Sequence, residues 1–247
     1  MRSLLKRRKK KIAHSIEAIH AAFPVLRGAE IAAAAAGRRR TGDFFDSIRV
    51  NPSRVLFGLL DLADRHEELR SEARRVFRVV GTKLLEGPEV NESDALTELC
   101  LQLNRSIIET AGPVHSSPAF AGCYNEDLGT VCYFNAGHTP GLVRHITGIS
   151  ELGATGLALG LFSHTTSDAQ IIALEAGAAL LLVSRAVVDA KRDGKRFGLS
   201  RVKETLVNSR SSSAYELCAS VLDAVHRFAP AEYEDTTALA LIRRTAS

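Results

Sequence analysis

Acidic residues stand where the chain is expected to enter or leave strands. Asp43 and Asp46 lie in "TGDFFD", Asp61 ends "VLFGLLD", and Glu234 and Asp235 precede "TTALALI". Carboxylates gathered from several strand ends are the ligands that a hard divalent cation such as Mg²⁺ or Mn²⁺ needs. Turns that face solvent also carry Asp and Glu, so the residue types alone leave a solvated role open beside the metal site.

A basic residue, Arg185, ends another apolar stretch. In "LLLVSRAVVDA" the continuous run from Leu180 to Val183 predicts a strand that is covered on both faces. Ser184 and Arg185 follow it directly. A charge at the inner end of a buried strand must find a partner or reach water. The sequence therefore predicts either an internal ion pair for Arg185 or a position beyond the strand in solvent.

The remaining motifs suggest little further chemistry. "GHTPG" lacks the lysine of a phosphate-binding loop, and the sequence contains no GxSxG, HExxH or EF-hand pattern. His138 is the most plausible acid–base residue, although a structural role in a turn is favoured. The run Arg38–Arg40 would suit a phosphorylated partner or plain solvated charge.

Composition predicts a globular cytoplasmic protein. The chain has 247 residues, of which 45% are hydrophobic and 24% charged. The net charge of +4 is concentrated in "KRRKKK" (6–11) and "RRR" (38–40), which makes a nucleic-acid binder unlikely, because such a protein spreads its charge over a face. No secretion signal or apolar run of membrane-spanning length is present. The four cysteines lack CxxC spacing, and reduced, half-buried thiols are the favoured interpretation. The alternative is that Cys123 and Cys132 face each other across a hairpin.

Residues 1–26 predict a basic N-terminal helix. Its apolar residues recur at heptad-like intervals: Leu5, Ile12, Ile16, Ile19, Phe23 and Leu26. Such a seam suits a homodimer or a docking element, and equally a helix that packs on its own domain. The basic run would also suit attachment to an anionic membrane or to nucleic acid.

The rest of the chain, 27–247, is predicted to be one domain. "AEIAAAAAG" (29–37) is ambiguous by propensity. The other expected elements, in chain order, are a hairpin turning at 51–53, helices at 64–85 and 93–110, a meander at 117–153, a strand pair around 175–177, helices at 197–208 and 213–228, and a final strand at 236–244. Blocks of strands and helices in this order predict an α+β domain with antiparallel sheets covered by helices.

Several segments in order resemble the metal-dependent PPM-type protein serine/threonine phosphatases, in particular the bacterial branch that includes SpoIIE and RsbU. The first is "FPVLRGAEIAAAAAGRRRTGDFFD", and it is followed in the family's order by "NAGHTPGLVRH", "LALGLF", "LEAGAALLLVS", "RFGLSRV" and "YEDTTALALIRR". The resemblance runs from about residue 12 to 244. It implies a four-layer αββα sandwich, in which two antiparallel sheets are flanked by helices. It also implies two Mn²⁺ or Mg²⁺ ions that activate a water for attack on phosphoserine or phosphothreonine.

The resemblance places the acids Asp43 and Asp61 at the first two metal positions and Glu234 at the fourth, followed by Asp235. The third position, an Asp-Gly pair in the family, reads Arg185-Ala186 here. The glycine-containing turn after the second acid is also lost, because the chain reads "LDLADRHEE". Arg185 would repel a divalent ion and could instead neutralise the acids as an internal counter-charge.

These departures predict a catalytically impaired phosphatase domain, a pseudophosphatase, that acts by binding a regulatory partner. Metal binding would then be weak or absent. An active Mn²⁺- or Mg²⁺-dependent phosphatase is the alternative. The resemblance implies a phosphorylated or regulatory protein partner of the kind that antagonises anti-sigma factors.

Overall fold

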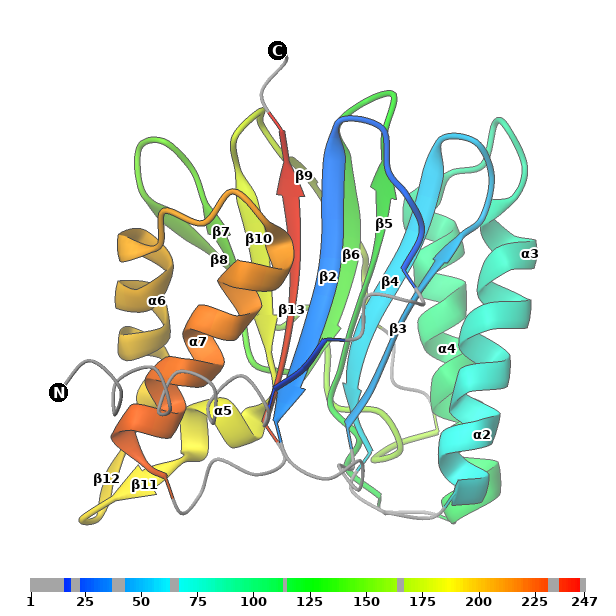
Figure 1. Cartoon of the computed structure of the whole chain (residues 1–247). Helices are drawn as coiled ribbons and strands as arrows, with labels where there is room; N and C mark the ends of the chain where they lie inside the picture. Colours follow the sequence, from blue (N-terminus) through cyan, green and yellow to red (C-terminus); the bar gives the residue numbers. More distant parts are fainter. Residues whose placement is uncertain are drawn as a thin grey trace, which may run out of the picture.

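The computed structural model describes residues 16–18, 23–36, 43–62, 67–112, 115–163, 167–230 and 236–244. Two antiparallel sheets form its centre (Figure 1). The six-stranded sheet has the order β1 (Ile16–Ala18), β2 (Ala29–Ala36), β13 (Thr236–Arg243), β10 (Ala179–Val183), β7 (Gly141–Arg144), β8 (Ile149–Leu152). The five-stranded sheet has the order β3 (Asp43–Arg49), β4 (Arg54–Asp61), β5 (Ala119–Asn125), β6 (Thr130–Ala136), β9 (Gln170–Ala173).

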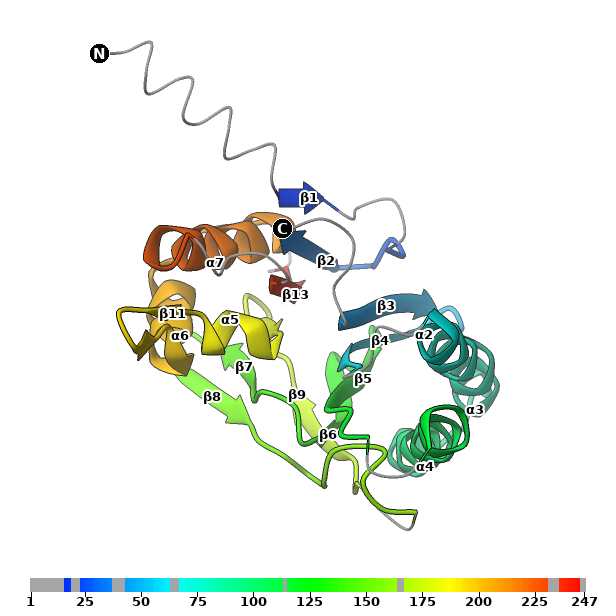
Figure 2. The same ribbon diagram turned by 90° about the horizontal axis from the view of Figure 1, so that it is seen from below.

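Helices cover the outer face of each sheet, as Figures 1 and 2 show. On the six-stranded side lie α5 (Arg185–Asp189), α6 (Gly198–Asn208) and α7 (Ala214–Phe228), together with a small hairpin of β11 (Lys191–Arg192) and β12 (Lys195–Arg196). On the five-stranded side lie α2 (Glu67–Arg75), the π-helical turn η2 (Val76–Val80), α3 (Gly81–Leu85) and α4 (Glu92–Ala111). The expected four-layer αββα sandwich is therefore confirmed.

Three apolar cores separate the four layers, and the strand periodicity assigns each residue to one of them. In β10, Leu180 and Leu182 belong to the core between the sheets, whereas Leu181 and Val183 belong to the core beneath α5–α7. The alanine-rich β2 divides in the same way, with Ala32, Ala34 and Ala36 beneath the helices. Both faces of these strands are covered, which explains why the sequence shows continuous rather than alternating apolarity.

Most of the expected elements are confirmed. The ambiguous alanine stretch is strand β2, and the hairpin turning at 51–53 is β3–β4. The long helix expected at 64–85 is helical from Glu67 to Leu85, with the turn η2 in its middle. The next helix begins after Asn91, whose side chain accepts hydrogen bonds from the backbone amides of Ser93 and Asp94 and so caps the helix. No helix in the described residues has the length and apolarity to cross a membrane.

The predicted N-terminal helix is wrong where the structure describes it. Ile16–Ala18 forms strand β1, which pairs antiparallel with Ala34–Ala36 at the edge of the sheet. An edge strand presents unpaired backbone donors and acceptors, and a segment that lies along it gains hydrogen bonds between strands. Residues 1–15 and 19–22 lie outside the described part, so the dimer through this segment and the domain boundary at residue 26 stay predictions.

The strand pairing expected around residues 175–177 is also wrong. β9 and β10 both exist, but β9 pairs with β6 in one sheet and β10 pairs with β7 and β13 in the other. The turn between them, with Gly177 at φ +83°, carries the chain across the sandwich. The meander at 117–153 likewise splits into a β5–β6 hairpin and a β7–β8 hairpin in different sheets.

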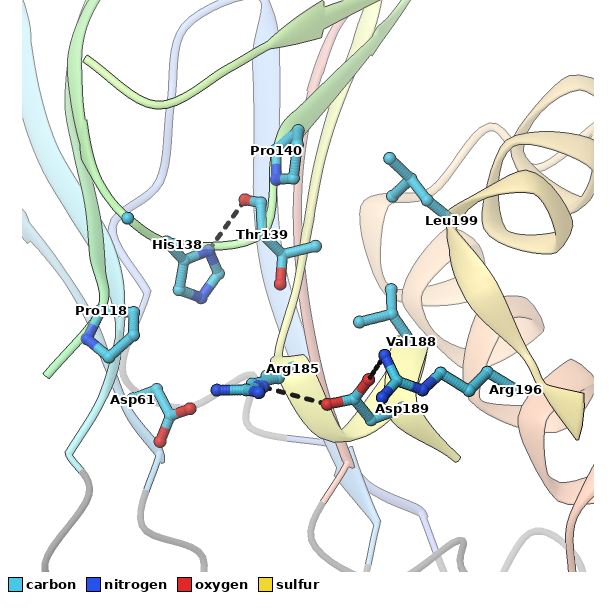
Figure 3. A pocket seen from close by; sticks show the side chains of 11 residues that line it. Asp61, Pro118, His138, Thr139, Pro140, Arg185, Val188, Asp189, Arg196 and Leu199 are labelled. Atoms are coloured by element: carbon cyan, nitrogen blue, oxygen red, sulfur yellow. Dashed lines mark hydrogen bonds and ion pairs between the residues drawn. The ribbon is translucent and has the colours of Figure 1, made fainter. Parts of the chain in front are cut away.

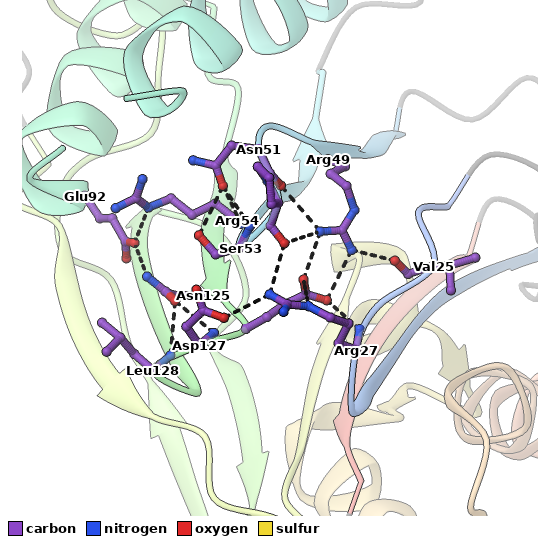
Figure 4. A network of polar contacts seen from close by, with 12 residues as sticks. Val25, Arg27, Arg49, Asn51, Ser53, Arg54, Glu92, Asn125, Asp127 and Leu128 are labelled. Atoms are coloured by element: carbon purple, nitrogen blue, oxygen red, sulfur yellow. Dashed lines mark hydrogen bonds and ion pairs between the residues drawn. The ribbon is translucent and has the colours of Figure 1, made fainter. Parts of the chain in front are cut away.

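A polar network holds the β3–β4 hairpin at its turn (Figure 4). Arg54 is 7% exposed and donates to Glu92 at 2.6 Å, and Glu92 also accepts from Asn125 at 2.8 Å. Arg49 donates to Glu126 at 2.8 Å. These bonds join the hairpin to α4 and to the β5–β6 turn, so the register of β3 against β4 is held from this end.

Candidate functional site

The opposite end of the β3–β4 hairpin carries two of the expected acids. Asp43 and Asp61 are direct partners in the antiparallel register. Residues two positions away on the same face, Phe45 and Leu59, pack in the core between the sheets. Asp43 and Asp61 therefore end the hairpin face that looks toward the other sheet, where directly opposed side chains lie close together.

Asp61 lines a pocket of about 350 Å³ at this end of the sandwich (Figure 3). The lining residues come from β4, from the segments before β5 and before β7, from α5, from β12 and from the start of α6. They are Asp61, Pro118, Gly137, His138, Thr139, Pro140, Arg185, Val188, Asp189, Arg196 and Leu199.

Arg185 enters this pocket from the first residue of α5. Ser184 follows β10, and its hydroxyl accepts a hydrogen bond from the Thr237 amide at 3.1 Å, which fixes the point where the chain leaves the sheet. The Arg185 Nε donates to Asp189 at 3.0 Å, one helical turn later. Figure 3 shows the other end of the guanidinium directed toward Asp61.

Asp189 joins two arginines. Its second carboxylate oxygen lies 3.2 Å from Nη1 of Arg196 on β12. The side chains of Arg185 and Arg196 are 69% and 63% exposed, whereas that of Asp189 is 33% exposed. The carboxylate therefore orients two cations at the pocket mouth while most of each side chain stays in solvent.

The carboxyl group of Asp61 has its pKa raised above the usual value. Burial is the larger cause, because it disfavours the charged form, and the positive charge of Arg185 partly opposes it. Arg185 thus acts on Asp61 through its charge, while its hydrogen-bonded ion pair is with Asp189. Among the described residues, Arg185 supplies a positive charge near Asp61, while the ion pair of its guanidinium is with Asp189 and not with Asp61.

His138 is held in a buried turn between β6 and β7. Its amide donates to the Asn135 side chain at 2.8 Å, and its Nδ1 lies 3.0 Å from the Thr139 carbonyl oxygen. A carbonyl only accepts, so Nδ1 carries the proton and Nε2 carries the lone pair. Burial lowers the pKa of His138 to about 4. Gly137 has φ +68°, and a Cβ there would lie 2.9 Å from the Ala158 amide nitrogen, which makes glycine necessary for this turn.

The expected site residues are only partly brought together. Asp61 and Arg185 share the pocket, and Asp43 lies opposite Asp61. Asp46 instead forms an ion pair with Arg78, whose Nε and Nη2 donate to it at 2.5 and 2.7 Å. Glu234 and Asp235, together with Arg38–Arg40, lie outside the described residues, so their roles stay predictions.

Sequence reasoning missed Asp189 and Arg196. Asp189 follows Arg185 by four residues, the spacing at which opposite charges meet on one helix face. Arg196 belongs to "KRDGKR", in which Asp-Gly between short strands indicates a tight hairpin. The charge spacing and the Asp-Gly turn are both visible in the sequence. Neither predicts that these residues lie at the pocket, because that depends on where α5 packs.

The described residues at the pocket include groups that favour a divalent cation and one that opposes it. Asp43 and Asp61 supply carboxylate oxygens, which such ions prefer. Arg185 contributes a fixed positive charge and no lone pair. No group of three or more His, Cys, Asp or Glu side chains suited to a metal occurs in the described part of the chain, from which Glu234 and Asp235 are missing.

Comparisons with known proteins identify the family. The family described as stage II sporulation protein E (SpoIIE) matches residues 66–245, which is more than half of the chain. Protein IcfG of Synechocystis is 28% identical over 132 residues, which cover 50% of this chain and 20% of IcfG. The chain therefore matches only about one fifth of that relative's length.

Solved structures share the fold at low identity. The RsbU and RsbW domains of Rv1364c from Mycobacterium tuberculosis align with a TM-score of 0.70 at 22% identity, over 92% of this chain and 64% of that one. The PP2C phosphatase domain of SpoIIE from Bacillus subtilis, with a fragment of its regulatory domain, aligns with a TM-score of 0.69 at 14% identity, over 89% and 64%. The two solved structures show that the fold is shared, and the match over residues 66–245 shows that the chain belongs to the SpoIIE family.

Proposed function

We propose that this domain is a catalytically impaired PPM-type phosphatase that works by binding a regulatory protein partner. The observation that carries the proposal is the guanidinium of Arg185 in the pocket with Asp61, at the position where the family resemblance implies a metal-binding aspartate. The residues present do not fit a centre of two divalent ions, because one expected ligand is replaced by a cation.

Electrostatics supports this assignment. Replacing a carboxylate by a guanidinium changes the local charge by two units. At about 5 Å and an effective dielectric near 20, the repulsion between one positive charge and a divalent ion is on the order of several kcal/mol. Arg185 is 69% exposed, so solvent screening reduces this figure. A loss of at least about tenfold in metal affinity is still expected.

An active metal-dependent phosphatase remains the second candidate. The observation that favours it is the register pairing of Asp43 with Asp61, which keeps two of the acids side by side. One structural relative, Rv1364c, contains an RsbW domain together with its RsbU domain, and this combination favours a protein partner for either function.

Calorimetric titration with Mn²⁺ separates the two candidates. The native chain is compared with Arg185→Asp, and Arg192→Asp serves as the matched control, because it makes the same charge change on an exposed residue that does not line the pocket. We expect weak or undetectable binding by the native chain and the control, and at least tenfold tighter binding by Arg185→Asp. Micromolar Mn²⁺ binding by the native chain with aryl-phosphate turnover would replace the first proposal by the second.

A further inference from the structure

Two cations that line the pocket are accompanied by three more on the β11–β12 hairpin. We call this surface the basic rim and define it as Arg185, Lys191, Arg192, Lys195 and Arg196. All five side chains are exposed. Residues 185–196 contain these five cations and only two carboxylates, a net charge of +3 in a chain whose total is +4.

The hairpin that carries most of the basic rim brings like charges together. Lys191 lies opposite Arg196 in the ladder, and Arg192 lies opposite Lys195. Like charges at directly opposed positions destabilise an antiparallel pair. The turn imposes this arrangement, because Asp193 and Gly194 have φ values of +52° and +76°, typical of a tight type I′ hairpin.

The base of the hairpin is fastened to its neighbours despite this repulsion. The Phe197 amide donates to the Ala190 carbonyl at 2.7 Å. Arg201 Nη1 donates to the carbonyls of Arg196 and Phe197 at 3.0 and 2.8 Å, and its guanidinium lies 4.7 Å from the Phe228 ring centre. The cations are therefore presented on a fixed support, which lowers the ordering cost of binding an anion.

The basic rim continues into the pocket through Asp189. This carboxylate holds both Arg185 and Arg196, so the hairpin and the pocket mouth form one surface (Figure 3). Each guanidinium uses one nitrogen for Asp189 in these contacts and keeps further N–H donors for another acceptor.

We infer that the basic rim docks an acidic segment of a partner protein and that one anionic side chain of this segment contacts Arg185 and Arg196 at the pocket. The inference rests on the proposed function as a binding domain and adds the chemistry of the ligand. A carboxylate and a phosphorylated serine or threonine are both anions that arginine binds in this way.

A protein segment suits this surface better than nucleic acid or a lipid bilayer. The excess positive charge is confined to a small hairpin, whereas nucleic-acid binders spread it along a face. Asp61 and Asp189 also line the pocket, and they would repel a continuous row of phosphates. A peptide can place one anion at the arginines and its neutral backbone amides near these carboxylates.

Fluorescence anisotropy with the full chain tests the docking surface. The probes are three fluorescein-labelled peptides that alternate Asp with Gly and carry phosphoserine, Glu or Ser at the centre, in EDTA at about 50 mM salt, where surface electrostatics is only partly screened. The double variant Arg192→Glu, Lys195→Glu reverses two charges of the basic rim. The matched control is Lys83→Glu, Arg105→Glu, which reverses two exposed charges on α3 and α4 in the opposite layer.

We expect the Kd for the phosphoserine peptide to rise at least about tenfold in the rim variant and to stay within about twofold of the native value in the control. Arg185→Gln should reduce the preference for phosphoserine or Glu over Ser, while the Ser peptide binds as before. Equal effects in the two double variants would overturn the docking surface. Equally tight binding of single-stranded DNA or of anionic vesicles would overturn the assignment to a protein partner.

The test of the docking surface can fail or succeed independently of the test of the proposed function. Aryl-phosphate turnover with Mn²⁺ would contradict the impaired phosphatase, yet the comparison of the two double variants in EDTA would stand. Loss of the difference between those variants would contradict the docking surface alone.

Discussion

Asp43 and Asp61 face each other across the β3–β4 ladder, at the end of the core between the sheets. The backbone holds these two carboxylates in register, and the buried pair Arg54–Glu92 at the other end of the hairpin keeps that register. The hairpin therefore retains the geometry of an acidic site, while the charge that Asp61 meets across the pocket is that of Arg185.

Removing the charge of Asp61 should stabilise the fold at neutral pH. Burial raises the pKa of Asp61, so its contribution to stability is present at low pH and is lost as pH rises through the folded-state value. Asp61→Asn should raise the unfolding free energy at pH 7 by roughly 0.5 kcal/mol, the usual size of a like-charge cross-strand effect. Urea denaturation at pH 7 and pH 3.5 measures the unfolding free energy, and we expect the variant to be more stable than the native chain only at pH 7. The exposed Asp168→Asn serves as control, and an equal gain there would contradict the explanation.

His138 should make the fold sensitive to acid. Burial lowers the pKa of His138 to about 4 in the folded state, against about 6.5 in an unfolded chain. The unfolded state therefore binds the proton first, and stability present above pH 6.5 is lost as pH falls toward 4, on the order of 3 kcal/mol in total. His138→Gln should be less stable at pH 7 but should show a shallower loss between pH 6.5 and 4.5. Parallel stability curves for the two proteins in urea would refute this account.

The buried pair Arg54–Glu92 should matter far more than a surface pair. Arg54→Met leaves Glu92, which is 9% exposed, without its cation and should cost about 3–5 kcal/mol. The double change Arg54→Met, Glu92→Leu should recover part of that loss, because no buried charge is left. In comparison, Arg75→Met breaks a surface ion pair with Glu72 and should lower the unfolding free energy far less, because solvent screens that pair. Denaturation in guanidinium chloride measures the unfolding free energy of all three variants. A double variant less stable than Arg54→Met would contradict the argument.

The cysteines should be inert in the folded protein. Cys100, Cys123, Cys132 and Cys218 are free and buried. Burial raises the pKa of Cys100 and of Cys132 to about 12, and it also raises the pKa values of Cys123 and Cys218. The thiolate is the reactive form, so iodoacetamide at pH 8 should label the native chain very slowly. Mass spectrometry should detect four modifications after unfolding. Rapid labelling of one thiol in the native chain would show that its strand opens.

Much of the fold could be predicted because its signals are local. The apolar run at Leu180–Val183 reports burial on both faces of a strand, and Asn91 marks the start of α4. The spacing of Cys123 and Cys132 allows them to face each other across a hairpin, and they do so in the β5–β6 register. Each of these features depends on residues close together in the chain.

Most of the elements, their order along the chain and the arginine at one of the family's acidic positions could be read from the sequence alone. The three-dimensional arrangement was needed to show that β9 and β10 belong to different sheets, that Ile16–Ala18 pairs with the sheet edge, and that Arg185 forms its ion pair with Asp189. The physical reason is that periodicity records how much of each side chain is buried, whereas the partner of a strand or a charge depends on where separate elements meet in space.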